Sequence, residues 1–275
     1  MPSKALIKTA KVAHTLRTAG RYGLSSVEPA TDLKAVMAHV RSIIDEIYEE
    51  ESPQALRAEG IDTYLGGAKF LDPHTLAAGE AALTARNILI ATGAHPYIPP
   101  IQGLADVGYL TSESIWALGT LPRHLLVVGA GPAGCEMAQA FRRLGSEVTL
   151  IASGDHILPR DEPDAAHVLD KVFAAEGIRI VYNARAELAW RGEAGTSQIH
   201  IGAGSNGLEG DALLIATGRR PNVDGLDLEK AGVDNTQMAS EWTTSCAPAS
   251  GTSMLPATVP AATSSPTMPA GRRPW

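Results

Sequence analysis

Apolar positions in the first quarter of the chain recur at steps of three and four residues. The clearest set is Leu33, Val36, Met37, Val40, Ile43, Ile44 and Ile47. This spacing places the apolar side chains on one face of a helix, and Asp32 before it is a residue type that caps helix starts. Helices are also predicted from Pro2 to about Ala19 and from Ser52 to Gly60.

The period shortens between residues 61 and 93, where short strands alternate with turns. The run Ile88–Gly93 is apolar and predicts a strand buried on both faces. Pro96, Pro99 and Pro100 follow it. Prolines set this closely interrupt regular structure, as expected where the chain crosses between domains.

From residue 125 the pattern alternates between strands and helices. Strands are predicted at 125–128, 147–151 and 178–181, with helices at 132–144 and 164–176 between them. This order predicts an α/β fold with a doubly wound parallel sheet. Short strands near 186–190 and 198–201 predict a small antiparallel excursion.

The sequence Leu-Ile-Ala-Thr-Gly occurs twice, at 89–93 and at 214–218. Each copy ends a strand-like run and is followed by a proline within three residues of its glycine. The repeat predicts two related nucleotide-binding domains in series. After Gln237 the chain is rich in Ala, Ser, Thr and Pro, which predicts a disordered tail.

Composition and charge narrow the range of possible functions. The formal net charge is −7 without a basic block, which argues against nucleic acid as a partner. No apolar run approaches the ~20 residues that cross a bilayer, so a soluble cytoplasmic protein without membrane partners is expected. The 2 cysteines and 8 histidines lack the spacing of a disulfide framework or a metal site.

One motif indicates a ligand-binding function. Gly129-Ala130-Gly131-Pro132-Ala133-Gly134 fits G-x-G-x-x-G between a predicted strand and a predicted helix. In this context Gly129 permits a tight turn, Gly131 lets a diphosphate approach the backbone, and Gly134 allows close helix–strand packing. The helix start, with Pro132 and Ala133 in its first turn, offers free N–H groups to an anion.

The end of the second predicted strand bears on the choice of coenzyme. A carboxylate there accepts hydrogen bonds from the ribose 2′-hydroxyl of NAD. The chain has Ala152, Ser153 and Gly154 instead, and Asp155 comes later. A 2′-phosphate would meet no repulsion from these residues, and Arg160 is near enough in sequence to assist. NADP is favoured slightly, and NAD remains open.

The segments ILIATGAHPYIPPIQGL, LLVVGAGPAGCEMAQAFRRLGSEVTLI and LLIATGRRPNVDGL together resemble the class I pyridine nucleotide–disulfide oxidoreductases, which include dihydrolipoyl dehydrogenase and mercuric reductase. The resemblance covers residues 1 to about 235 and is strongest to mercuric reductase-like members. It implies a two-dinucleotide-binding-domain flavoprotein, homodimeric through a carboxy-terminal domain. Hydride would pass from NAD(P)H to FAD, and electrons then to a CxxxxC disulfide.

The resemblance also assigns residues. Lys4 matches the lysine of a C-I-P-S-K motif near the flavin. Glu136 and Gly218 match residues at the nicotinamide coenzyme. The residues that match FAD-contacting positions are Ala68, Thr92, Gly93 and Ala94.

The chain departs from the family pattern at both ends. In the family, the first FAD strand, its glycine loop and the redox cysteines precede C-I-P-S-K, whereas this sequence begins at Met1-Pro2-Ser3-Lys4. Back-translating the tail and reading it two nucleotides further on gives a run that resembles the family's second flavin motif. A frameshift near Gln237–Met238 is therefore expected, with loss of the dimer domain.

These observations predict an incomplete version of the fold with three parts. Residues 1–118 form part of an FAD domain, 119–233 form the NAD(P) domain, and 234–275 form a frameshifted tail. The expected function is that of an FAD-dependent NAD(P)H oxidoreductase whose present chain, without redox cysteines or a catalytic His and Glu, is inactive. The alternative is a stand-alone NAD(P)-binding module. A one-domain alcohol dehydrogenase is disfavoured because no Y-x-x-x-K follows the glycine loop.

Overall fold

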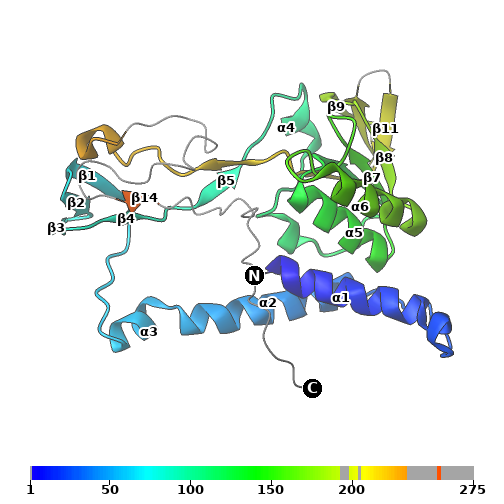
Figure 1. Ribbon diagram of the computed structural model, residues 1–275, viewed down its shortest axis with the longest axis horizontal. Helices are drawn as coiled ribbons and strands as arrows, with labels where there is room; N and C mark the ends of the chain where they lie inside the picture. The colour runs from blue at the N-terminus through cyan, green and yellow to red at the C-terminus, as the bar shows by residue number, and fades with distance from the viewer. Residues whose placement is uncertain (1, 193–197, 204–205, 234–252, 255–275) are drawn as a thin grey trace. The chain divides into compact units, whose positions relative to one another are not determined.

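The computed structural model describes residues 2–192, 198–203, 206–233 and 253–254 (Figure 1). They fall into two compact units, which are described separately. The first joins Met1–Thr63 to Pro96–Arg219, and the second joins Tyr64–His95 to Arg220–Trp275. The domain boundaries at 118 and 233 stay a prediction. The expected frameshifted tail lies outside the described residues, except for β14 (Ser253–Met254).

The first unit contains all of the longer helices. Its helical elements are α1 (Pro2–Arg17), η1 (Ala19–Tyr22), α2 (Leu33–Glu50), α3 (Pro53–Ala58), α4 (Leu104–Val107), η2 (Ile115–Ala117), α5 (Pro132–Leu144) and α6 (Pro163–Glu176). The predicted cap is present, because the Asp32 carboxylate accepts a hydrogen bond from the Ala35 N–H at 3.2 Å. The first three predicted helices are therefore confirmed.

A four-stranded sheet forms the centre of the first unit. Its order is β12 (Ala212–Ile215), β6 (His124–Val128), β7 (Glu147–Ile151) and β8 (Arg179–Val181), and every neighbouring pair is parallel. The chain moves outward from β6 through β7 to β8 and then returns to the other side of β6. The α/β prediction is confirmed, and the strand order reverses at β6, where ligands bind in open parallel sheets.

The two faces of this sheet are covered differently. Helices α5 and α6 cover one face, where Phe141 and Phe173 pack with Leu125 and Leu150. The other face is covered by an antiparallel sheet of β11 (Asn206–Gly210), β10 (Ile199–Ala203) and β9 (Ala186–Arg191). The predicted excursion is thus a third layer with one strand more than expected (Figure 1).

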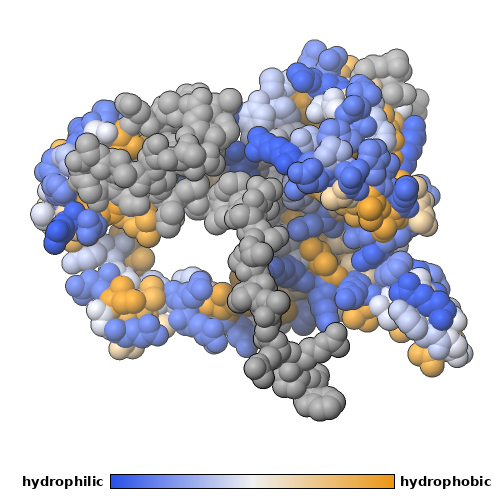
Figure 2. All heavy atoms as spheres, in the orientation of Figure 1, coloured by the Kyte–Doolittle hydropathy of each residue, from blue (hydrophilic) through white to orange (hydrophobic). Residues whose placement is uncertain are grey.

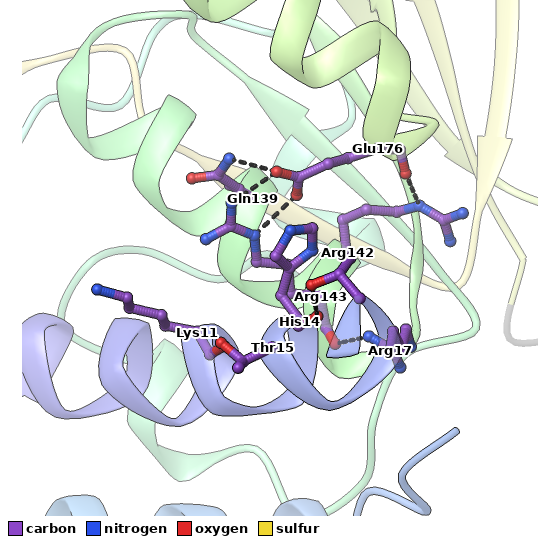
Figure 3. A network of polar contacts seen from close by, with 9 residues as sticks. Lys11, His14, Thr15, Arg17, Gln139, Arg142, Arg143 and Glu176 are labelled. Carbon is purple, nitrogen blue, oxygen red and sulfur yellow. Dashed lines mark hydrogen bonds and ion pairs between the residues drawn. The ribbon is translucent and has the colours of Figure 1, made fainter. Parts of the chain in front are cut away.

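Helix α1 packs along α5, and a polar network fastens the two to the end of α6 (Figure 3). Arg143 on α5 forms an ion pair with Glu176 at 2.6 Å, and both side chains are largely buried. The Glu176 carboxylate also accepts from the Gln139 amide at 3.0 Å. Arg17 on α1 donates to the main-chain oxygen of Arg143. These contacts fix the helix that begins at the glycine turn.

The outer side of α1 is partly apolar. Val12 is 50% and Leu16 40% exposed, beside Lys8 and Lys11. Figure 2 shows apolar and polar side chains interspersed along the helices in this part of the molecule. Within the described residues, no helix is both long enough and apolar enough to cross a membrane.

The second unit is mostly strand. It contains β1 (Ala68–Asp72), β2 (Thr75–Ala78) and β3 (Ala81–Thr84) as an antiparallel sheet, with β4 (Leu89–Ile90) and η3 (Leu228–Ala231). Strand β4 pairs in parallel with β14. Strands β5 (Ala94–Pro96) and β13 (Arg219–Pro221) pair where the chain passes between the units.

The prediction that Ile88–Gly93 is a strand buried on both faces is wrong. Only Leu89–Ile90 is extended as β4, and Leu89 is 59% exposed. Ile88 and Ile90 are buried in the small core around Phe70. Because β4 pairs with two residues of β14 and nothing covers its outer side in the described part of the unit, Leu89 faces solvent.

Candidate functional site

The glycine turn lies at the carboxyl end of β6, between β7 and β12. Gly129 has a φ of 110°, and a Cβ there would lie 2.4 Å from the Ala216 carbonyl oxygen. A Cβ at Gly134 would lie 1.9 Å from the Gly129 oxygen. Gly131 differs, because a Cβ built there meets nothing within 4 Å. The turn is therefore tightly packed at its first and last glycines and open at its middle one.

Helix α5 begins directly at this open glycine. Gly131 is its N-cap, with extended backbone, and Pro132 is its first residue. Pro132 and Ala133 are exposed, and the N–H groups of a helix's first turn have no partner within the helix. The partial positive charge of the helix start adds to them. The arrangement can bind a diphosphate without any cationic side chain.

The end of β7 presents no carboxylate to this edge. Ala152 is buried, and its N–H and carbonyl bond to the Val181 oxygen and the Ala184 N–H. Ser153 is the first exposed side chain after the strand. The carboxylate of Asp155 lies 2.6 Å from the His156 ring, and this hydrogen bond holds the pKa of Asp155 below its usual value.

One residue of this edge was missed from the sequence. The Leu158 N–H donates to the Ala130 carbonyl at 2.8 Å, which ties the segment after β7 to the glycine turn. Leu158 has a φ of 53°, an uncommon conformation for a branched side chain. Its sequence carries no signal for either feature, since leucine is typical of neither left-handed backbone nor ligand contact.

The third part of the edge is the end of β12. The Ala216 N–H donates to the Val128 oxygen at 2.8 Å, so this segment lies beside the end of β6. Gly218 has a φ of 128° and is exposed. The structure therefore brings Gly129, Gly131, Gly134 and Gly218 to one edge of the sheet, together with Ala152 and Ser153.

Lys4 and Glu136 lie on the helices next to this edge. Lys4 is in the first turn of α1 and Glu136 is early in α5, and both are exposed. Neither side chain forms a hydrogen bond or ion pair within the described part of the chain. Their assignment to flavin and nicotinamide therefore stays a prediction.

Cys135 also lies in the first turns of α5, but it is buried. Its Sγ donates to the Ala130 oxygen at 3.4 Å. Burial, followed by the nearby carboxylates of Asp161 and Glu136, raises the pKa of the thiol to about 12. Cys135 stabilises the glycine turn through this hydrogen bond and is not a nucleophile at neutral pH.

The remaining FAD candidates lie in the second unit. Thr92, Gly93 and Ala94 form the turn between β4 and β5, where Gly93 has a φ of 76°. Ala68 is the exposed first residue of β1, paired with Ala78.

Asn222 holds this turn and was missed from the sequence. Its carbonyl accepts from the Thr92 hydroxyl at 2.6 Å, its amide donates to the Thr92 oxygen at 3.0 Å, and its N–H donates to the Gly93 oxygen at 2.9 Å. Its side-chain oxygen lies 2.7 Å from the His95 ring. A signal was available, because Asn222 follows the threonine of the second Leu-Ile-Ala-Thr-Gly copy by five residues.

A cavity of about 550 Å³ lies at the opposite edge of the sheet, away from the glycine turn. Its lining includes Arg123, His124 and Asp211. The Asp211 carboxylate accepts from the main-chain N–H groups of Arg123 and His124 at 3.0 and 2.9 Å, and these bonds fix the start of β6. Asp211 therefore has a structural role, and the glycine turn remains the candidate site.

The residues at the glycine edge fit a nicotinamide dinucleotide, because Gly131 is open and the helix start supplies N–H donors. The described residues contain one Gly-x-Gly-x-x-Gly turn between a strand and a helix, and its assignment to NAD(P) stays a prediction, as does the incomplete FAD site. Within the same residues, no group of three His, Cys, Asp or Glu side chains could hold a metal ion.

Comparison with known proteins agrees with this geometry. The profile of the family described as pyridine nucleotide-disulphide oxidoreductase matches residues 1–239. The chain is 33% identical over 235 residues to a mercuric reductase of Lysinibacillus sphaericus, covering 85% of this chain and 43% of the relative. It is 36% identical over 240 residues to a mercuric reductase of Streptomyces lividans, covering 85% and 50%. The chain therefore spans about half the length of these relatives.

Solved structures show the same likeness. The HOCl-induced flavoprotein disulfide reductase RclA from Escherichia coli superposes with a TM-score of 0.76 at 26% identity, covering 92% of this chain and 55% of that one. LpdA from Mycobacterium tuberculosis superposes with a TM-score of 0.73 at 30% identity, covering 86% and 52%. With a profile match over most of its length and a glycine turn at the sheet's reversal point, the chain belongs to the pyridine nucleotide-disulphide oxidoreductase family.

Proposed function

We propose that this protein binds NADH or NADPH at the carboxyl edge of its parallel sheet, with the coenzyme's diphosphate on the Gly129–Gly134 turn. Members of the family bind FAD and use NAD(P)H. The observation that carries the proposal is the open space at Gly131, next to the first turn of α5. A bound nicotinamide coenzyme would supply the hydride, and the residues of this edge would orient it.

Each part of the edge has a separate task in this proposal. The N–H groups of Ala133 and Gly134 would donate to the diphosphate, while Gly131 lets it approach. Glu136, exposed on α5, would accept a hydrogen bond from the nicotinamide half. Gly218, exposed beside the turn, would close the site against the coenzyme.

We expect a preference for NADPH. Ala152 is buried and Ser153 offers a hydroxyl, so a 2′-phosphate would meet no carboxylate at the strand end. Asp155, the first acid in sequence after the strand, is already bonded to His156. Arg160 is exposed in the segment that Leu158 ties to the glycine turn and is the candidate cation for the phosphate.

For the whole protein, the proposed activity is FAD-dependent oxidation of NAD(P)H with reduction of a disulfide or a metal ion, in a homodimer. The present chain is proposed to bind coenzyme without completing that reaction. Its thiols are Cys135, which is buried, and Cys246, outside the described residues, and they do not form a CxxxxC pair. The chain therefore has no adjacent pair of thiols to relay electrons.

Isothermal titration of the full chain with NADPH and NADH tests the binding proposal. Gly131→Val should abolish the heat of binding, because a side chain there fills the approach to the backbone without clashing in the fold. Gly119→Val is the matched control, since a Cβ at Gly119 also meets nothing within 4 Å, and it should bind normally. A wild-type chain that gives no heat with either coenzyme would refute the proposal.

The alternative is a stand-alone NAD(P)-binding module, which is supported by the single Gly-x-Gly-x-x-Gly turn in the described residues. Absorbance separates the two functions. Purified protein that is yellow and bleaches when NADPH is added supports a flavoprotein reductase. Colourless protein that binds NADPH in the titration supports the stand-alone module.

A further inference from the structure

We infer that Thr217 is a positioning residue for the coenzyme, because its hydroxyl fixes the Gly218 turn beside the glycine loop. The inference rests on the proposed coenzyme site and adds a residue to it that touches no coenzyme. It follows from how the two Ala-Thr-Gly segments are bonded.

Each segment forms two hydrogen bonds, one through its threonine hydroxyl and one through its glycine carbonyl. Both bonds go to a single residue that follows the other segment. The Thr92 hydroxyl donates to the Asn222 carbonyl at 2.6 Å, and the Thr217 hydroxyl donates to the Tyr97 carbonyl at 2.8 Å. The Asn222 N–H donates to the Gly93 oxygen, and the Tyr97 N–H donates to the Gly218 oxygen, both at 2.9 Å. Each acceptor follows the threonine of the other repeat by five residues. The repeated sequence therefore produces the same bonding arrangement twice. Thr92 and Asn222 lie in the second compact unit, and Thr217 and Tyr97 lie in the first.

The second pair lies in the first unit, at the proposed coenzyme edge. Strand β12 ends at Ile215, and the Ala216 N–H still bonds to the Val128 oxygen of β6. Beyond Ala216 the chain leaves the sheet, so its path depends on the two bonds to Tyr97. Those bonds bracket the Thr217–Gly218 peptide, one through the Thr217 side chain and one through the Gly218 carbonyl.

The position so fixed is in contact with the glycine turn and open to a ligand. A Cβ at Gly129 would lie 2.4 Å from the Ala216 oxygen and 3.0 Å from the Thr217 nitrogen, which shows how closely the two backbones approach. A Cβ at Gly218 meets nothing within 4 Å. Thr217 itself is half-buried and points its hydroxyl at Tyr97. Its effect on a coenzyme is therefore through the backbone it holds.

The test compares three variants of the full chain by titration with NADPH. Thr217→Val keeps the shape of the side chain and removes its hydroxyl. It should raise the Kd by about three- to tenfold, which corresponds to the loss of one hydrogen bond. Thr217→Ser restores the hydroxyl and should restore the wild-type Kd. Thr31→Val is the matched control, because the Thr31 hydroxyl also donates to a main-chain oxygen, that of Leu144 at the far end of α5, at 2.6 Å.

The expected result is weaker binding in Thr217→Val alone, with thermal unfolding shifted similarly in Thr217→Val and Thr31→Val. An unchanged Kd in Thr217→Val would overturn the inference while leaving the coenzyme site intact. Equal weakening in Thr31→Val, or no rescue by serine, would overturn it by showing a general loss of stability. A wild-type chain that binds no coenzyme would instead refute the proposed function.

Discussion

The glycines of the 129–134 turn differ in what surrounds them. Gly129 and Gly134 are enclosed by backbone, whereas Gly131 faces open space. A substitution at an enclosed position must move main-chain atoms, and one at the open position changes only what can approach from outside. Stability and coenzyme binding can therefore be separated within one motif.

Gly134→Ala tests the enclosed position. The added Cβ would lie 1.9 Å from the Gly129 oxygen, so α5 must shift away from the turn. We expect a loss of about 1–3 kcal/mol in the free energy of unfolding, as for overpacked cores, measured by urea denaturation. Gly119→Ala is the control, because a Cβ there meets nothing within 4 Å, and it should unfold at the same urea concentration as the wild type. Equal stability of the two variants would contradict the packing argument.

Cys135 should react slowly with thiol reagents. Its raised pKa, about 12, leaves very little thiolate at pH 8, and its side chain is buried. In a Cys246→Ser background, labelling by an aromatic disulfide should be far slower than that of a free thiol, and urea should restore the normal rate. Rapid labelling of the folded protein would show that the turn opens readily.

At the scale of elements, α1 and α5 are held by charges as well as by apolar packing. The His14 ring lies at this interface near the guanidinium groups of Arg143 and Arg17 and the carboxylate of Glu176 (Figure 3). The charge of Arg21 also acts on it. Burial, and then the charge of Arg143, lower the pKa of His14 below its usual 6.5, although Glu176 acts in the opposite direction. The neutral ring is therefore the form that fits the folded protein.

This shift predicts how stability depends on pH. The unfolded state binds a proton on His14 more readily than the folded state, so the contribution of His14 is present above pH 6.5 and is lost as the pH falls towards the folded pKa. His14→Gln should flatten the fall in the free energy of unfolding between pH 7.5 and 5.5. His39→Gln, at an exposed position on α2, is the control and should leave that slope unchanged.

Elements with strong local signals could be predicted from sequence. The Asp32 cap, the apolar face of α2 and the glycines that end α5 and α6 are local signals, and the structure has all of them. The 88–93 strand could not be predicted correctly, because burial of Leu89 depends on which elements cover its face of β4. Leu158 and Asn222 were missed because their roles depend on backbone groups far away in the sequence.

For the whole molecule, the two compact units should respond differently to coenzyme. The proposed site lies in the first unit, so NADPH at 100 times its Kd should stabilise that unit by about 2.7 kcal/mol. In differential scanning calorimetry we expect one transition to move upward with NADPH while the other stays in place. A single transition that moves as a whole would show that the units unfold together.

The first compact unit joins segments that are far apart in the sequence. It combines residues 1–63 with 96–219, while the domain boundaries at 118 and 233 stay a prediction. That grouping arises because the buried side of α1, including Leu6 and Ala10, packs in one core with Phe141 of α5. Periodicity identifies an apolar face but not the partner that covers it.

The pairing of α1 with α5 has a consequence for how the protein is made. Arg17 and Arg143, which meet in the folded chain, are 126 residues apart. A ribosome adds ~5–20 residues per second, so α1 emerges on the order of ten seconds before its partner. Throughout that interval the apolar face of α1 lacks its α5 partner, so a holding chaperone has the time and the surface to bind the nascent polypeptide.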